Sequence, residues 1–98
     1  MSVTFAKGFE AAGVASGLKV NGNKDVALVV NRGSSRAAAA VFTSNRCRAN
    51  PILWSEEAIS DGQAVAVVIN SGGANCYTGP QGFQTTHATA ELVAELLA

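Results

Sequence analysis

The chain has 98 residues, of which 48% are hydrophobic and only 14% are charged. This length allows one compact domain at most, and so little charge leaves a small polar surface, so we expect part of its apolar surface to contact another polypeptide. Seven basic side chains balance seven acidic ones without blocks of either sign, which argues against nucleic acid and anionic membranes as partners.

The first half of the chain predicts turns followed by strands. Four glycines within residues 1–25 favour turns and short irregular extended pieces. Residues 26–30, Val-Ala-Leu-Val-Val, form a short apolar run typical of a strand buried on both faces. Residues 37–43 predict a second strand, paired with the first in an antiparallel hairpin, although their alanine run is also compatible with a helix.

The second half predicts a helix, a strand and a final helix. Asn50 is a good N-cap and Pro51 suits the first helical position, so a helix is expected over residues 51–60. Residues 64–69, Ala-Val-Ala-Val-Val-Ile, give the clearest strand pattern. Because polar residues do not alternate there, we expect a layer on both sides of the sheet. Apolar residues at helical spacing predict a helix over residues 83–97.

Together these elements predict an α/β fold (α+β layered) in which a mixed sheet packs with helices. The order is an irregular extended start, a hairpin, a helix, a strand, a glycine-rich loop and a helix. The strand at 64–69 runs directly into that loop, at residues 70–75. Free N–H groups in such a loop can hold an anion or an oxyanion. The competing interpretation is a tight turn that only shapes the connection, since neither the dinucleotide fingerprint nor the P-loop is present.

Two ring-bearing residues are candidates for a site. His87, the only histidine, needs a nucleophile or a carboxylate close to it in the fold before it can catalyse anything. A hydrogen-bonded, partly buried helix histidine is the simpler interpretation. Trp54 favours a core or subunit contact over a ligand platform.

The loop before the first predicted helix carries charge and a thiol. Arg46 and Arg48 are suited to clamp a carboxylate, or they face solvent as most charged side chains do. Cys47 lies between them and is a candidate for a lowered thiol pKa; a solvated loop cysteine is the alternative. Cys47 and Cys76 are too few for a secreted disulfide framework, and with one histidine they are too few for zinc, so no metal site is predicted.

The compartment follows from what the sequence lacks. No uncharged stretch approaches the ~20 apolar residues of a membrane span. Residues 1–9 lack the basic start, apolar core and cleavage site of a secretion signal. We therefore expect a cytoplasmic protein with reduced thiols, without membrane or nucleic-acid partners.

Several stretches keep a common order and spacing over nearly the whole chain. They are residues 7–15, 25–31, 39–45, 51–55, 68–75, 78–80 and 86–91. In this order they resemble the bifunctional ornithine acetyltransferase/glutamate N-acetyltransferase family of arginine biosynthesis. The most specific segments are Asn-Ser-Gly-Gly-Ala-Asn at 70–75 and Thr-Gly-Pro at 78–80.

The chain departs from the family pattern in two loops. Cys76 and Tyr77 stand where the family usually has a small residue followed by cysteine. Cys47 and Asn50 replace the more usual aliphatic or small residues before Pro51.

The resemblance implies that residues 1–98 are a single partial domain, the N-terminal portion of the DmpA/ArgJ-like fold. They would belong to the alpha chain of a precursor that cuts itself into two chains. The second chain would begin with a threonine that takes an acetyl group from N-acetylornithine, or in some members from acetyl-CoA, and passes it to glutamate. The implied partners are the rest of the alpha chain, the beta chain and these small substrates, in a hetero-oligomeric (heterotetrameric) enzyme without cofactors.

No catalytic residue maps onto this chain, because the family's threonine nucleophile and oxyanion-hole segment fall after residue 98. The chain alone is therefore expected to be inactive. A loop at the end of a strand is expected to border the substrate pocket; it consists of Ser71, Gly72, Gly73, Ala74 and Asn75. The alternative function is a truncated, non-catalytic interaction or scaffold module of the same fold. A weaker alternative is an unrelated small domain that binds anions through the same loop.

Overall fold

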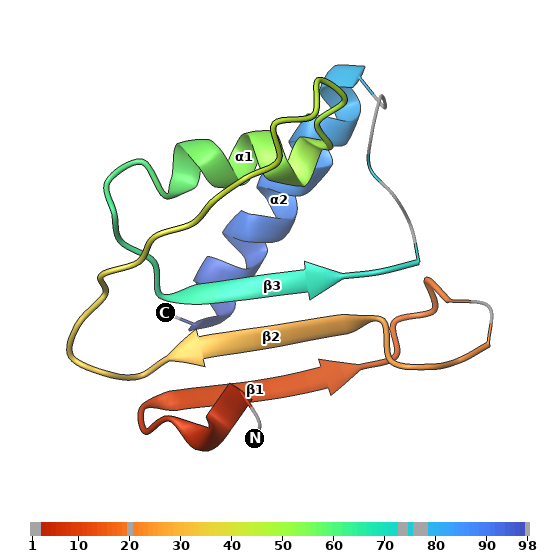
Figure 1. Cartoon of the computed structure of the whole chain (residues 1–98). Helices are drawn as coiled ribbons and strands as arrows, with labels where there is room; N and C mark the ends of the chain where they lie inside the picture. Colours follow the sequence, from red (N-terminus) through yellow and green to blue (C-terminus); the bar gives the residue numbers. More distant parts are fainter. Residues whose placement is uncertain (1–2, 20, 73–74, 76–78, 98) are drawn as a thin grey trace. The chain divides into compact units, whose positions relative to one another are not determined.

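A computed structural model describes residues 3–19, 21–72, 75 and 79–97, which fall into two compact units. One unit comprises Met1–Ala38 and Gln63–Gly73, and the other comprises Ala39–Gly62 and Ala74–Ala98. The described elements, labelled in Figure 1, are a 3-10 helix at Val3–Phe5, β1 at Phe9–Val14, β2 at Val26–Asn31, α1 at Asn50–Ala58, β3 at Ala66–Asn70 and α2 at Gly79–Leu97. These strands and helices confirm the predicted α/β class.

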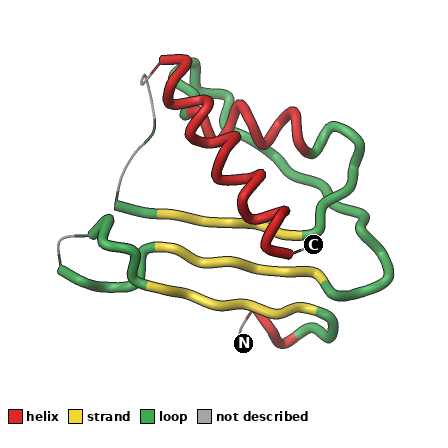
Figure 2. The backbone as a smooth tube through the Cα atoms, turned by 180° about the vertical axis from the view of Figure 1, so that it is seen from behind, coloured by secondary structure: helices red, strands yellow, loops and turns green. Residues whose placement is uncertain are grey.

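In the described part of the first unit, three antiparallel strands form a sheet in the order β1-β2-β3, drawn in yellow in Figure 2. The central strand places Leu28 opposite Ala12 of β1 and Val68 of β3. Val30 points to the same face as Leu28 because side chains alternate along a strand. It is only 5% exposed, and among the described residues no other apolar side chain is buried. The strand predicted over residues 26–30 is confirmed, but its predicted burial on both faces is not, because residues 26–29 are only half-buried.

The strand β1 is more regular than the sequence indicates. The expectation for residues 1–25 was turns and irregular extended pieces, yet Phe9–Val14 pair with β2 along six consecutive residues. Glutamate, alanine and glycine have low β-propensity. Pairing with the apolar edge of β2 overrides that local preference by supplying backbone hydrogen bonds.

The predicted strand at residues 37–43, and with it the hairpin to residues 26–30, is wrong. The structure gives this segment only an isolated bridge between Ala37 and Gln63. A strand has two edges, and both edges of β2 are occupied by β1 and β3. No edge of β2 is left for residues 37–43, and Val41 is accordingly 99% exposed.

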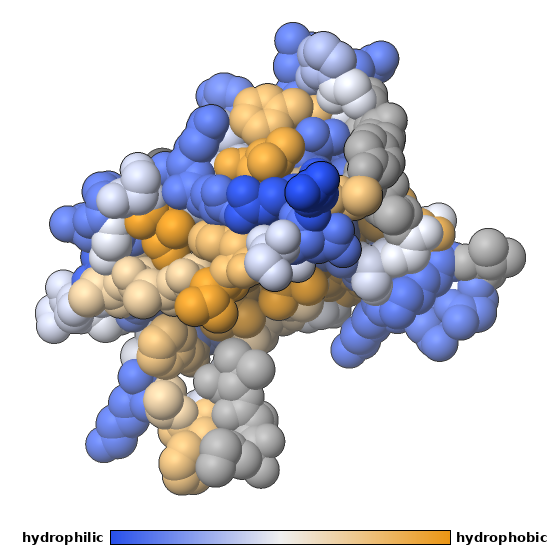
Figure 3. Space-filling view, turned by 45° about the horizontal axis from the view of Figure 1, so that its top comes forward, coloured by the Kyte–Doolittle hydropathy of each residue, from blue (hydrophilic) through white to orange (hydrophobic). Residues whose placement is uncertain are grey.

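The strand β3 confirms the pattern at residues 64–69, displaced slightly toward the C-terminus. The expected cover on both faces is not observed among the described residues of the sheet unit. Val67 and Ile69 point to one face and are 54% and 51% exposed. Figure 3 likewise shows apolar residues, coloured orange, at the surface. Exposed large apolar side chains of this kind usually mark a contact surface.

The helix α1 confirms the prediction for residues 51–60 but begins differently. Ala49 is the cap residue, with extended backbone angles and no side-chain cap bond. Asn50 was predicted as the cap and is instead the first helical residue. Its buried side-chain amide donates to Asn75 Oδ1 at 3.0 Å, so a contact 25 residues away competes successfully with local capping.

The helix α2 matches the predicted helix at 83–97 and extends it by one turn toward the N-terminus. Its half-buried positions recur at the predicted helical spacing: Thr86, Ala90, Val93 and Leu97. Glu91 and Glu95 lie exposed on another side, as an amphipathic helix requires. No helix in the described part of the chain combines the length and the apolar character that crossing a bilayer requires.

Candidate functional site

The first polar centre is the side chain of Asp25, directly before β2. It is only 4% exposed. Oδ1 accepts hydrogen bonds from the backbone N–H and the hydroxyl of Ser16, both at 2.7 Å. Oδ2 accepts from the backbone N–H groups of Leu18 at 2.7 Å and Lys19 at 3.1 Å. One carboxylate thereby fixes the backbone of residues 16–19, which we call the Asp25 loop.

These hydrogen bonds also settle the charge of Asp25. The Ser16 hydroxyl, followed by the backbone N–H groups of the loop, lowers the pKa of the Asp25 carboxyl far below its ordinary value; burial opposes this but is outweighed. Hydrogen bonds donated to a carboxylate favour its ionised form. Asp25 is therefore an anion at neutral pH. All the N–H groups that donate to its carboxylate belong to the backbone.

The beginning of the predicted site loop lies directly against the Asp25 loop. The backbone N–H of Ser71 donates to the backbone oxygen of Asp25 at 2.9 Å. Gly72 has φ +95°, which side chains rarely tolerate, and a Cβ placed there would lie 2.9 Å from Lys19 Cγ and 3.4 Å from the backbone of Leu18. Only glycine permits both the turn and this close approach.

A shallow hollow lies at the same end of the sheet. It is lined by Gly13, Lys24, Asp25, Val26, Ala27, Ile69 and Ser71. The lining combines apolar strand residues with the hydroxyl of Ser71 and the charged residues Lys24 and Asp25.

Asn75, the last residue of the predicted site loop, is the polar centre of the helical unit. Its Nδ2 donates to the backbone oxygen of Gly82 at 2.8 Å and to Thr86 Oγ1 at 2.9 Å, both on α2. Its backbone oxygen accepts from the N–H of Asn50 at 2.9 Å, at the start of α1. Asn75 thus joins the first turn of α1 to the first turns of α2.

The predicted site loop therefore divides between the two units. Ser71 and Gly72 are anchored to the sheet unit, and Asn75 is anchored to the helical unit. Gly73 and Ala74 lie outside the described residues, as do Cys76 and Tyr77 of the family departures.

His87 has two partners within the helical unit. Its ring stacks on Trp54 with centroids 4.3 Å apart, and its Nε2 lies 2.7 Å from Glu91 Oε1, one helical turn away. Trp54 also meets Phe83 edge-on at 6.1 Å. These contacts make His87 a helix histidine paired with a carboxylate and place Trp54 in a contact between α1 and α2. Glu91 is also the nearby carboxylate that a catalytic His87 would need, whereas no nucleophile is recorded beside the ring among the described residues.

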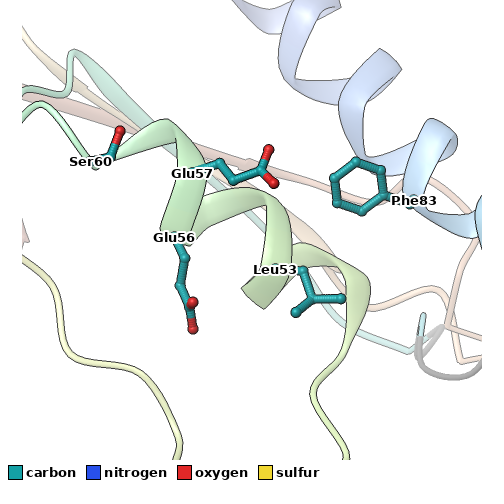
Figure 4. A pocket seen from close by; sticks show the side chains of 5 residues that line it. All are labelled: Leu53, Glu56, Glu57, Ser60 and Phe83. Carbon is teal, nitrogen blue, oxygen red and sulfur yellow. The ribbon is translucent and has the colours of Figure 1, made fainter.

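A second hollow lies beside this cluster, shown in Figure 4, and is lined by Leu53, Glu56, Glu57, Ser60 and Phe83. Figure 4 shows the carboxylate of Glu57 on the side of Phe83, while Glu56 points away from it. Glu56 forms an ion pair with Arg48. The two carboxylates are therefore separated, and no paired acid and base is formed.

The two arginines of the loop do not form one clamp. Arg48 is engaged by Glu56, whereas Arg46 is exposed. Cys47 is exposed as well, which agrees with a loop cysteine in water. Across residues 3–19, 21–72, 75 and 79–97, no group of three metal-ligating side chains comes together.

The sequence gives one indication that Asp25 is buried. It follows Lys24 after the polar turn Asn21–Asn23 and directly precedes the apolar run at 26–30. A charged residue next to a buried strand needs partners if it is itself buried. The identity of those partners, six to nine residues earlier, depends on how the loop folds back.

Comparison with known proteins shows which family the chain resembles. The family model described as "ArgJ family" matches residues 10–98. The arginine biosynthesis bifunctional protein ArgJ of Streptomyces avermitilis is 65% identical over 97 residues, which are 99% of this chain and 25% of that protein. The corresponding protein of Mycobacterium leprae is 55% identical over 95 residues, 97% of this chain and 23% of that protein.

Solved structures agree with these matches. The ornithine acetyltransferase of Mycobacterium tuberculosis, crystallised in complex with ornithine, has a TM-score of 0.95 and 55% identity over 97% of this chain and 49% of that chain. The ArgJ protein of Bacillus halodurans has a TM-score of 0.88 and 35% identity over the same shares. The chain spans about a quarter of the length of the curated relatives that it matches.

Proposed function

The chain belongs to the ArgJ family, and from this premise we propose that it forms part of an acetyltransferase of arginine biosynthesis. In this proposal it is the N-terminal part of the alpha chain of a self-cleaving precursor. The acetyl group moves from N-acetylornithine, or in some members from acetyl-CoA, to glutamate. The observation that carries the proposal is the 65% identity to an ArgJ protein over 99% of the chain.

The chemistry of the proposed reaction needs a nucleophile that this chain does not supply. An N-terminal threonine on the second chain would attack the acetyl carbonyl, releasing ornithine, and the acyl-threonine would then pass the acetyl group to the amine of glutamate. His87 gives no substitute, because its contacts in the structure are Trp54 and Glu91 rather than a hydroxyl or thiol. The chain contributes architecture to the site.

We assign to this chain one border of the substrate pocket, the loop from Ser71 to Asn75. Its support is the position at the C-terminal end of β3, the anchoring of Ser71 and Gly72 on the Asp25 loop, and the adjacent hollow. Within the sheet unit, Ser71 and Gly72 are held by backbone contacts to the Asp25 loop. Such support is what a site that must keep its shape around a small amino-acid substrate requires.

The test uses the complete gene product. Intact mass of the purified protein is expected to show two fragments, one beginning with threonine, and the protein should convert N-acetylornithine and glutamate into ornithine and N-acetylglutamate. The 98-residue chain alone should show no turnover. Turnover by that chain, freed of contaminants, would contradict the proposal. A single species near 10.0 kDa would instead favour the truncated interaction module. The exposed apolar side chains are also compatible with such a module.

A further inference from the structure

Both oxygens of the Asp25 carboxylate are bound by the loop of residues 16–19. A buried, ionised carboxylate is costly unless each oxygen is fully hydrogen-bonded. Here both oxygens of Asp25 receive two donors each, at 2.7 to 3.1 Å. Such a site resists rearrangement because moving any one donor leaves part of a buried charge unpaired.

Two contacts link Asp25 and its loop to the Ser71–Gly72 turn at the pocket border. The backbone oxygen of Asp25 accepts from the N–H of Ser71. Leu18 and Lys19, whose N–H groups are bound by the Asp25 carboxylate, lie against Gly72, where an added Cβ would be 2.9 Å from Lys19 Cγ. Asp25 therefore supports the backbone of residues 71–72 in two ways, directly through its own backbone oxygen and indirectly through Leu18 and Lys19.

We propose that Asp25 is a positioning residue for acetyl transfer: by holding residues 16–19 it fixes the Ser71–Gly72 turn at the border of the substrate pocket. The inference rests on the proposed function. Asp25 does not touch substrate; it acts through the loop and through its own backbone oxygen. Its loss is expected to weaken substrate binding more than the chemical step.

The carboxylate is specifically required. In Asp25→Asn the side chain keeps its size, but one of its two oxygens becomes an NH2 group. Whichever way the amide turns, donors of Ser16 or of Leu18 and Lys19 then face another donor. That side of the loop must move away, and the Ser71–Gly72 turn moves with it.

The experiment measures acetyl transfer by the complete enzyme and separates KM for N-acetylornithine from kcat. For Asp25→Asn we expect KM to rise about 10-fold, with kcat within about 2-fold of the wild type, the pattern of lost ground-state binding. Ser16→Ala removes only the hydroxyl donor and should raise KM by about 2-fold to 3-fold. Asp61→Asn, an exposed aspartate remote in sequence from this loop, is the control and should leave both constants unchanged.

A second readout excludes a merely structural effect. Hydrogen exchange of the Ser71 amide should quicken in Asp25→Asn while exchange within β2 and α2 stays as in the wild type. An unchanged KM in folded Asp25→Asn overturns the proposal, and so does a loss of kcat with KM unchanged. If Asp25→Asn yields no folded enzyme, Ser16→Ala decides: an unchanged KM there also overturns it.

A glycine pair separates this proposal from the function on which it rests. Gly72→Ala introduces a Cβ against Lys19 and Leu18, whereas Gly62→Ala, at φ +74° and outside the Asp25 loop, introduces one with nothing within 4 Å. Both positions have positive φ and so carry backbone strain, but only the first substitution adds an atom at the pocket border. If Gly72→Ala raises KM and Asp25→Asn does not, the Asp25 proposal fails alone. If neither raises KM, the assignment of the pocket border fails.

Discussion

At the scale of single residues, the charged side chain of Asp25 holds a loop of the chain in place. Four donors from a loop of the chain surround one carboxylate. Their combined effect on the pKa exceeds the opposing effect of burial. The same contacts order residues 16–19 without any regular secondary structure in that segment.

The depressed pKa of Asp25 predicts a pH dependence. An unfolded aspartate binds its proton near pH 3.9, whereas the folded Asp25 stays ionised to lower pH. The unfolded state therefore binds more protons, and the contribution of Asp25 to stability is present above about pH 4 and is lost as pH falls. The gap in thermal midpoint between the wild type and Asp25→Asn should be largest near pH 6 and should shrink toward pH 3. A gap that stays constant over this range would contradict the assignment.

At the scale of elements, the helical unit depends on Asn75 as well as on apolar contacts. The side chain of Asn75 bonds to Asn50 of α1 and to Gly82 and Thr86 of α2. Trp54 of α1 adds a stacked contact with His87 of α2. A single amide thus connects two helices whose first residues are 29 positions apart, at 50 and 79.

Replacing this amide tests its contribution. We expect Asn75→Ala to lower the free energy of unfolding by about 2 kcal/mol, because it removes three side-chain hydrogen bonds and leaves the buried Asn50 amide without this acceptor. Asn45→Ala, which removes one exposed turn bond to Cys47 N, is the matched control and should change stability by less than about 0.5 kcal/mol. Urea unfolding of the complete protein measures both. Equal effects of the two substitutions would refute a special role of Asn75.

At the scale of the whole molecule, the described residues bury few apolar side chains. Val30 is the one buried apolar side chain among the described residues, while Phe5, Val41, Val67, Ile69 and Leu96 are each more than half exposed. A chain of this size has a small core even when it is well packed. These side chains are suited to contacts with the rest of a longer protein.

The isolated chain is therefore expected to unfold without a sharp transition and to bind a hydrophobic dye. In the complete protein the same surface should be covered, so dye fluorescence per chain should fall by about 5-fold or more, as expected for an apolar patch that becomes an interface. Circular dichroism on heating and dye titration provide the measurements. A cooperative transition without dye binding in the isolated 98 residues would show that they form a self-sufficient domain.

Much of the fold could be predicted from local patterns. We identify β2 and β3 from the apolar runs at 26–30 and 64–69, and α2 from the helical spacing at 83–97. These patterns can be read within each segment alone, because the spacing of its apolar residues reflects its own secondary structure. The strand β1 and the failed strand at 37–43 could not be predicted, because each depends on which segment occupies an edge of β2. Of the candidate site, the loop 71–75 was identifiable by its glycines and its place after a strand, whereas the role of Asp25 was not.

By itself the sequence determined the family, the fold class, the strands at 26–30 and 64–69 and the glycine-rich loop, since ordered motifs and periodicity are present along the chain. Only the tertiary structure decided which donors surround Asp25, that Gly72 lies against Leu18 and Lys19, and that Asn75 joins α1 to α2. The physical reason is that hydrogen-bond partners and strand edges are chosen in space, often between residues far apart in sequence, and no local pattern records that choice.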